Sequence, residues 1–176
     1  IETAEALQEA GIEVTIVEML PQILTFLDWE MAKLVENHAR SKGANVIVNN
    51  GVAEFLGKDG HITGVKLKNG TELECELAVV SIGVIPNVKL AKDAGLTIGA
   101  LGGIEVDNHM RTSDKDIYAV GDCVEIQHRL TGKKVLAPYG DLANLEGRVA
   151  GENVIMGDVA TFPGTVQSGI CKVFEY

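Results

Sequence analysis

Helix-like and strand-like patterns alternate along the first fifty residues, and this alternation constrains the fold more than any other feature. Gly11 and Gly43 are placed to stop two helices, and Asp28 is placed to cap the second one. Strands that alternate with helices in this way are typical of a parallel sheet. The predicted order is a helix at 1–10, a strand at 12–17, a helix at 29–42 and a strand at 44–48.

The period then changes from helical to strictly alternating. Residues 62–68 and 71–75 alternate apolar and polar side chains on either side of Asn69-Gly70, a strong hairpin turn. Residues 77–82 follow as an apolar run that predicts a strand buried on both faces. The pattern therefore predicts an α/β fold in which an antiparallel β-hairpin or meander is inserted into a parallel sheet.

A second lobe is predicted after a glycine-rich link at 99–103. Its central strand is expected at 117–120, and a final helix is expected at about 140–155. Shorter strands are predicted at 104–106, 124–127 and 134–136, with the last two paired around Thr131-Gly132. The inner face of the final helix is predicted to consist of Leu142, Leu145, Val149 and Val154.

The charge and composition exclude several classes of protein. The 15 basic and 25 acidic side chains give a formal charge of -10, and no cluster of Lys and Arg stands out, so we expect no nucleic-acid partner. No apolar run reaches eighteen residues, so we expect no membrane span and a soluble, cytoplasmic protein. Cys75, Cys123 and Cys171 lie far apart, and the four histidines have no metal-ligand spacing, so we expect free thiols and no metal site.

The stretch from Thr112 to Asp122 is the main candidate for chemistry. Its apolar run at 117–120 ends in Gly121-Asp122, and ligands of open α/β sheets sit beyond the carboxyl ends of the strands. An ionised carboxylate there accepts hydrogen bonds from a polyol such as a ribose or ribityl chain. Taken alone, the pair also fits an ordinary turn after a strand.

An acidic residue also ends the first predicted strand. In a dinucleotide-binding unit, an acid at the position of Glu18 binds the adenosine ribose of NAD and repels the extra phosphate of NADP. That interpretation needs a glycine-rich phosphate-binding turn just upstream, which the chain begins too late to include. A surface glutamate after a strand is the alternative.

Two further segments have weaker signals. Gly83 follows the predicted buried strand and lets a ligand approach the backbone, while Pro86 stiffens the same loop. A plain strand-to-helix loop explains both residues equally. Pro138, Tyr139 and Gly140 begin the final helix, whose free N–H groups and dipole favour negative charge, as every helix start does.

Taken together, these segments resemble the pyridine nucleotide-disulfide oxidoreductase family of FAD and NAD(P)H enzymes. Residues 1–18 look like the helix, strand and terminal acid of its NAD domain, and residues 81–87 resemble its G-V-x-P-N loop beside the nicotinamide. Residues 112–122 resemble its second FAD motif, and residues 138–148 resemble the helix that points at the flavin pyrimidine. The resemblance implies FAD and NAD(H) as cofactors, bound by Glu18, Gly83, Pro86, Gly121, Asp122, Pro138, Tyr139 and Gly140.

The resemblance also implies a domain organisation. The expected fold is Rossmann-like, with two dinucleotide-binding domains. Residues 1–98 correspond to the NAD(P)-binding domain without its glycine-rich turn, residues 99–158 to the C-terminal half of the FAD-binding domain, and residues 159–176 to the start of a dimerisation domain. We expect an internal fragment of a homodimeric protein. The first FAD motif and the redox cysteine of the family lie outside it, so no catalytic residue is assigned and the isolated fragment is expected to be inactive.

The function implied is that of an FAD-dependent NADH oxidoreductase. It is similar to the branch of NADH oxidases, NADH peroxidases and coenzyme A disulfide reductases, with Asp28–Ala32, Gly164-Thr165 and Lys172–Phe174 as the matching segments. Hydride passes from NADH to FAD, and electrons pass on to a small-molecule acceptor, a disulfide or oxygen. Two alternatives stay open: a non-catalytic NAD(H)-binding redox-sensing module, and a rubredoxin or ferredoxin reductase.

Overall fold

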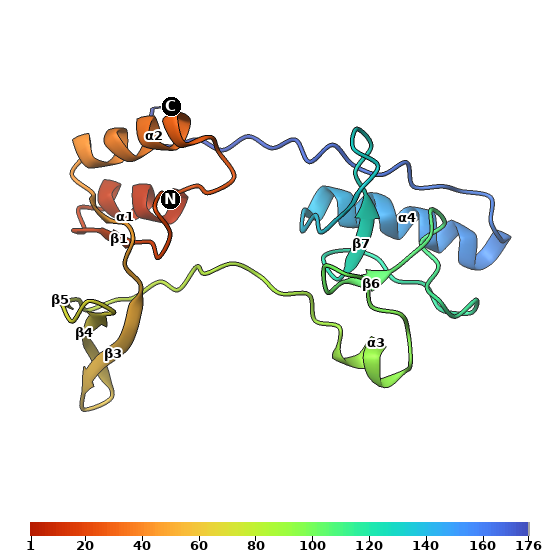
Figure 1. Cartoon of the computed structure of the whole chain (residues 1–176), viewed down its shortest axis with the longest axis horizontal. Coiled ribbons are helices and arrows are strands. Elements are labelled where there is room, and N and C mark those ends of the chain that lie inside the picture. Colours follow the sequence, from red (N-terminus) through yellow and green to blue (C-terminus); the bar gives the residue numbers. More distant parts are fainter. Residues whose placement is uncertain (176) are drawn as a thin grey trace. The chain divides into compact units, whose positions relative to one another are not determined.

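The helices and strands of the chain, drawn in Figure 1, group into two compact units. The computed structural model describes residues 1–175. Unit 1 consists of residues 1–81 and 170–175, and unit 2 consists of residues 82–169. This division does not test the limits 98/99 and 158/159 of the implied domains, which stay a prediction. Within the described residues, no helix combines the length and apolar character needed to cross a membrane.

Unit 1 begins with the predicted order of helix, strand, helix and strand. These elements are α1 (Glu2–Glu9), β1 (Thr15–Val17), α2 (Trp29–Ser41) and β2 (Asn45–Ile47). Strands β1 and β2 are parallel, with Ile16 opposite Val46. The expectation of parallel pairing is therefore confirmed, although β1 is shorter than the run at 12–17.

An antiparallel meander follows in the same unit. It consists of β3 (Val52–Lys58), β4 (His61–Leu67) and β5 (Glu72–Glu74), in that spatial order. The predicted Asn69-Gly70 turn joins β4 to β5, and Gly70 has a φ of 90°, which a residue without a Cβ adopts at low cost. Strand β3 was not predicted, because its side chains are mostly exposed and show no clean alternation.

The core of unit 1 contains residues from both ends of the chain. Val173 and Phe174 pack in one buried cluster with Ile23, Ala39 and Val46. Glu5 of α1 accepts hydrogen bonds from Lys172 Nζ and from the Phe174 N–H, each at 2.6 Å. The segment 172–174 is therefore an integral part of this unit.

Unit 2 is built around a short three-stranded sheet. Its elements are α3 (Lys89–Asp93), β6 (Ile104–Glu105), β7 (Val124–Gln127), β8 (Lys134–Val135) and α4 (Gly140–Met156). Strand β7 is central, parallel to β6 and antiparallel to β8. The predicted pairing around Thr131-Gly132 and the predicted final helix are both confirmed.

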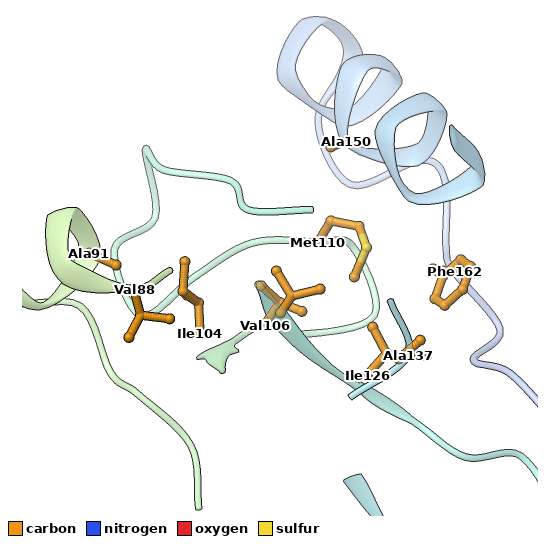
Figure 2. Close-up of a cluster of buried hydrophobic side chains, with 10 residues drawn as sticks. Val88, Ala91, Ile104, Val106, Met110, Ile126, Ala137, Ala150 and Phe162 are labelled. Atoms are coloured by element: carbon orange, nitrogen blue, oxygen red, sulfur yellow. The ribbon is translucent and has the colours of Figure 1, made fainter. Parts of the chain in front are cut away.

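The core of unit 2 joins elements that are far apart in the sequence. Figure 2 shows Ile126 and Ala137 beside Phe162, with Met110 between these residues and Ala150 of α4. These side chains are at most 8% exposed. Burial of such apolar surface contributes roughly 25 cal/mol for each Å², which makes this cluster the main source of stability in unit 2.

Two predicted strands are wrong. Residues 77–82 form no strand, and Val79, Val80 and Ile82 are exposed, because no described strand pairs with this segment. Residues 117–120 form only an isolated antiparallel bridge, in which Tyr118 is opposite Arg111. The Ala119 N–H donates to Met110 O, so this segment folds onto the preceding loop and not into the sheet.

The predicted link at 99–103 is also wrong, because it is a folded part of unit 2. Glu125 is 2% exposed, and its Oε1 accepts the N–H groups of Leu101 (2.7 Å) and Gly103 (3.1 Å). A Cβ at Gly99 would overlap the same carboxylate, so the glycine allows its close approach. The buried acid of β7 thus fixes the loop.

The predicted inner face of the final helix is correct only in part. Leu142 and Val149 of α4 pack on the core, but Leu145 and Val154 are exposed. On α2, Leu34 is likewise exposed. In both helices the buried positions are taken by small or polar side chains, namely Ala32, Glu36 and Ala39 of α2 and Glu146, Ala150 and Asn153 of α4.

Candidate cofactor-binding site

The Gly121-Asp122 turn lies directly before β7 and against the helix α4. Gly121 has a φ of 84°, and a Cβ placed on it would lie 3.6 Å from the Cβ of Ala143. Its N–H donates to Oε2 of Glu146 at 2.6 Å. Asp122 is exposed beside this contact. A carboxylate that accepts hydrogen bonds is therefore presented to solvent next to the first turns of α4.

The start of α4 provides a second feature at the same place. Tyr139 is the N-cap residue in an extended conformation, and no side chain caps the helix. Pro138, Tyr139 and Gly140 are exposed. The first N–H groups of a helix have no partner within the helix, and the dipole of a 17-residue helix adds positive potential there. This end of α4 can stabilise an anionic group.

The carboxyl group of Glu146 has a shifted pKa. Burial raises the pKa of Glu146, the hydrogen bond from Gly121 lowers it, and the neighbouring charge of Asp122 raises it, with an overall increase. Burial also raises the pKa of the Cys123 thiol. Burial therefore favours the neutral thiol of Cys123 over the nucleophilic thiolate.

The loop with Gly83 and Pro86 is open. Ile82 and Ile85 are each 92% exposed, and a Cβ on Gly83 would meet nothing within 4 Å. Gly83 nevertheless has a φ of 95°, which is unfavourable for a residue with a side chain. Pro86 is half-buried. The segment lies at the start of unit 2 as an irregular extended stretch before α3 (Figure 1).

Glu18 lies at the carboxyl end of β1, as predicted. Its N–H donates to Ile47 O at 2.8 Å and so extends the pairing with β2 by one residue. Its Oε1 accepts the N–H of Leu20 at 2.8 Å. This local bond fixes the direction of the carboxylate while leaving lone pairs for a further donor.

The predicted site residues are divided between the two units. Gly121 and Asp122 lie with the start of α4 in unit 2, whereas Glu18 belongs to unit 1. A family model described as pyridine nucleotide-disulphide oxidoreductase matches residues 1–139 and thus covers all of these positions except Gly140. The chain belongs to the pyridine nucleotide-disulphide oxidoreductase family.

Known proteins of this kind match over much of the chain. A curated NADH oxidase of Methanocaldococcus jannaschii is 39% identical over 127 residues, which are 72% of this chain and 28% of that protein. The solved NAD-dependent persulfide reductase of A. fulgidus is 49% identical with a TM-score of 0.91, over 98% of this chain and 32% of that chain. A solved FAD-dependent oxidoreductase of the same family from Desulfovibrio vulgaris is 39% identical with a TM-score of 0.89, over 98% of this chain and 43% of that chain. The chain thus spans less than half the length of each relative.

Glu146 is a residue of this candidate site that the sequence analysis did not name. It is 1% exposed and bonded to the Gly121 turn, and it lies inside the segment 138–148 that resembles the family's flavin helix. A signal does exist, because Glu146 lies four residues after Leu142 and four before Ala150, on the apolar face of the helix. A charged side chain at such a position is rarely buried without a specific partner.

The cysteines at 75, 123 and 171 are free thiols. Between residues 1 and 175, no three His, Cys, Asp or Glu side chains gather in a way that could hold a metal ion. The chemistry that these residues offer is hydrogen bonding and charge stabilisation, which suits cofactor binding.

Proposed function

We propose that this chain carries cofactor-binding surfaces of an enzyme that transfers hydride from NADH to FAD and then electrons to a small acceptor. The observation that carries the proposal is the Gly121-Asp122 turn against the uncapped start of α4. The persulfide reductase among the relatives supports an acceptor with a sulfur–sulfur bond, such as a disulfide or persulfide. The NADH oxidase supports oxygen as the alternative acceptor.

The residues of unit 2 fit the flavin. The Asp122 carboxylate accepts hydrogen bonds from ribityl hydroxyls, and Gly121 leaves room for the cofactor because it has no side chain. Pro138, Tyr139 and Gly140 lead into α4, whose free N–H groups would stabilise negative charge on the flavin. FAD itself supplies the group that accepts the hydride and releases the electrons.

The remaining residues serve the nicotinamide cofactor. Glu18 accepts hydrogen bonds from the adenosine ribose hydroxyls of NADH and repels the additional phosphate of NADPH. Gly83 and Pro86 form the loop that borders the nicotinamide ring. The local bond from Leu20 to Glu18 supports this role, because it directs the carboxylate before the nucleotide arrives.

The assembly in which these surfaces work is also part of the proposal. Residues 1–98 belong to an NAD(P)-binding domain, residues 99–158 to an FAD-binding domain, and residues 159–176 to a dimerisation domain. The full-length protein is a cytoplasmic homodimer. Light scattering of the purified full-length protein gives the mass of two chains if this is correct.

Replacing Asp122 tests the flavin site. Asp122→Asn in the full-length protein is expected to weaken FAD binding about tenfold to a hundredfold, since hydrogen bonds to a charged acceptor contribute about 1.5–3 kcal/mol. The measurement is titration of the apoprotein with FAD, followed by flavin fluorescence. Asp116→Asn, at another exposed aspartate of the same stretch, is the matched control and should leave the affinity unchanged. A wild-type protein that binds NADH but no FAD would instead be the non-catalytic sensor.

Replacing Glu18 tests the nucleotide site. Glu18→Arg is expected to lower the ratio of kcat/KM for NADH to kcat/KM for NADPH by at least about tenfold, because the repulsion of the phosphate becomes attraction. Steady-state kinetics with both nucleotides measure this ratio. Glu13→Arg is the matched control, because it makes the same change of charge at an exposed residue of unit 1. If both variants change the ratio equally, Glu18 has no specific role.

A further inference from the structure

Glu146 combines features that a residue serving only the core would not need. It is 1% exposed on α4, yet it carries a carboxyl group, whose burial is costly unless a specific hydrogen bond compensates. Oε2 receives the N–H of Gly121 at 2.6 Å, a short distance typical of a charge-assisted bond. The acid thus connects the middle of α4 with the turn that carries Asp122.

The turn itself depends on this contact. Gly121 has a φ of 84° and no side chain, so its N–H is the group through which α4 can hold it. The next residue, Asp122, is exposed and close enough for its charge to act on Glu146. If the bond to Gly121 is lost, a partly buried N–H loses this partner and the turn can move away from α4.

We infer that Glu146 is a positioning residue for the flavin site, which holds the Gly121-Asp122 turn against α4 through the Gly121 N–H. This inference rests on the proposed function, because it takes Asp122 and the start of α4 as parts of one cofactor site. Glu146 does not touch the cofactor. It keeps the acceptor of the ribityl hydroxyls and the positive end of α4 in one fixed arrangement.

The chemistry of the bond decides which substitutions retain this role. Glu146→Gln keeps an oxygen at the same distance along the side chain, so it can accept the Gly121 N–H without a charge. Glu146→Leu has a similar volume but no acceptor. Comparison of the two variants therefore distinguishes the loss of the hydrogen bond from the loss of packing volume.

FAD affinity of the full-length apoprotein is the first measurement. Glu146→Leu is expected to weaken FAD binding at least about fivefold, and Glu146→Gln is expected to stay within about threefold of the wild type. A smaller loss in the Leu variant overturns the inference. An equally large loss in the Gln variant also overturns it, since the acceptor would then not be the property that matters.

Two matched variants separate positioning from general loss of stability. Asn153→Ala removes another buried polar side chain of α4 and should lower the melting temperature without weakening FAD binding. Glu152→Gln changes an exposed glutamate of the same helix and should alter neither property. A loss of FAD affinity in Asn153→Ala as large as in Glu146→Leu contradicts a specific role of Glu146.

A second measurement does not depend on cofactor binding. It is the exchange of the Gly121 amide hydrogen with deuterium, followed by NMR in the absence of FAD. The amide should exchange slowly in the wild type and in Glu146→Gln, and at least about tenfold faster in Glu146→Leu. Fast exchange in the wild type overturns the inference even if the Leu variant does not fold. If the wild type binds no FAD, the proposed function fails. If the wild type binds FAD and Glu146→Leu binds it equally well, only the positioning role fails.

Discussion

Asn153 shows how a single buried amide organises a loop. Its Nδ2 donates to the carbonyl oxygens of His109 and Ala160, and its Oδ1 accepts the N–H groups of Val159 and Ala160, all within 2.9–3.1 Å. Both donor hydrogens and both lone pairs are thus used. The Asn153 side chain thus joins the chain after α4 to the loop at His109, together with the contact of the His109 ring with Ala160 O and the hydrogen bond from the Phe162 N–H to Asn108 O.

Asn153→Ala is expected to lower the free energy of unfolding of unit 2 by about 2–4 kcal/mol, because four hydrogen bonds to backbone groups are lost together. Denaturation in urea, followed by circular dichroism, measures the change. Asn144→Ala, at an exposed position of the same helix, is expected to change it by no more than about 0.5 kcal/mol. Equal effects of the two substitutions would show that the amide network contributes nothing.

Single residues of the candidate site were predictable to different degrees. Gly121 and Asp122 could be predicted because a glycine and an acid after an apolar run form a local pattern. Glu146 and Glu125 could not, since their importance comes from backbone N–H groups 25 and 22 residues away. The place of Glu146 on the apolar face of its helix indicates that the side chain is buried, but the distant N–H group that it binds leaves no local signature.

Helix α1 and the segment 172–174 illustrate how an element is completed by a distant part of the chain. The hydrogen bonds from Lys172 and from the Phe174 N–H lower the pKa of Glu5. A carboxylate with a lowered pKa stabilises the folded state above its unfolded pKa of about 4.3 and loses this contribution as the pH falls through the folded pKa. Glu175 acts in the same direction, because Lys42 lowers its pKa.

We expect acidification from pH 6 to about pH 3 to release this segment from α1. The exchange of the Phe174 amide with deuterium, corrected for the intrinsic pH dependence, should become faster over this interval. In Glu5→Gln the amide should exchange faster already at pH 6, with a smaller change on acidification. Glu13→Gln, at an exposed residue of unit 1, is the control and should behave like the wild type.

The elements that were predicted correctly are those whose signal is local. Helix α2, helix α4 and the turn between β4 and β5 follow from helical periodicity and turn residues. Asp28 stands at the N-cap position of α2 as predicted, but its side chain makes no capping hydrogen bond. Residues 77–82 and 117–120 have the composition of strands, but a strand forms only where a partner is available. In the described chain these segments have no partner strand, so composition alone gave the wrong result.

At the scale of the whole molecule, each unit has its own buried cluster within the described residues. A cluster that is confined to one unit stabilises that unit, so distant substitutions should act independently. Val46→Ala is expected to lower the free energy of unfolding of unit 1 alone, and Ile126→Ala that of unit 2 alone, each by about 1–4 kcal/mol. Differential scanning calorimetry of the single and double variants measures both transitions. One transition that shifts as a whole in every variant would contradict two independent units.

The discontinuity of unit 1 affects the order in which the chain can fold during synthesis. Residues 82–169 leave the ribosome before Val173 and Phe174 do, although these two side chains belong to the cluster around Ile23 and Val46. The unit that begins later can therefore finish first, which reverses the usual progression from the N-terminus. Until the segment with Val173 and Phe174 emerges, the nascent protein exposes an incomplete apolar surface around Ile23 and Val46.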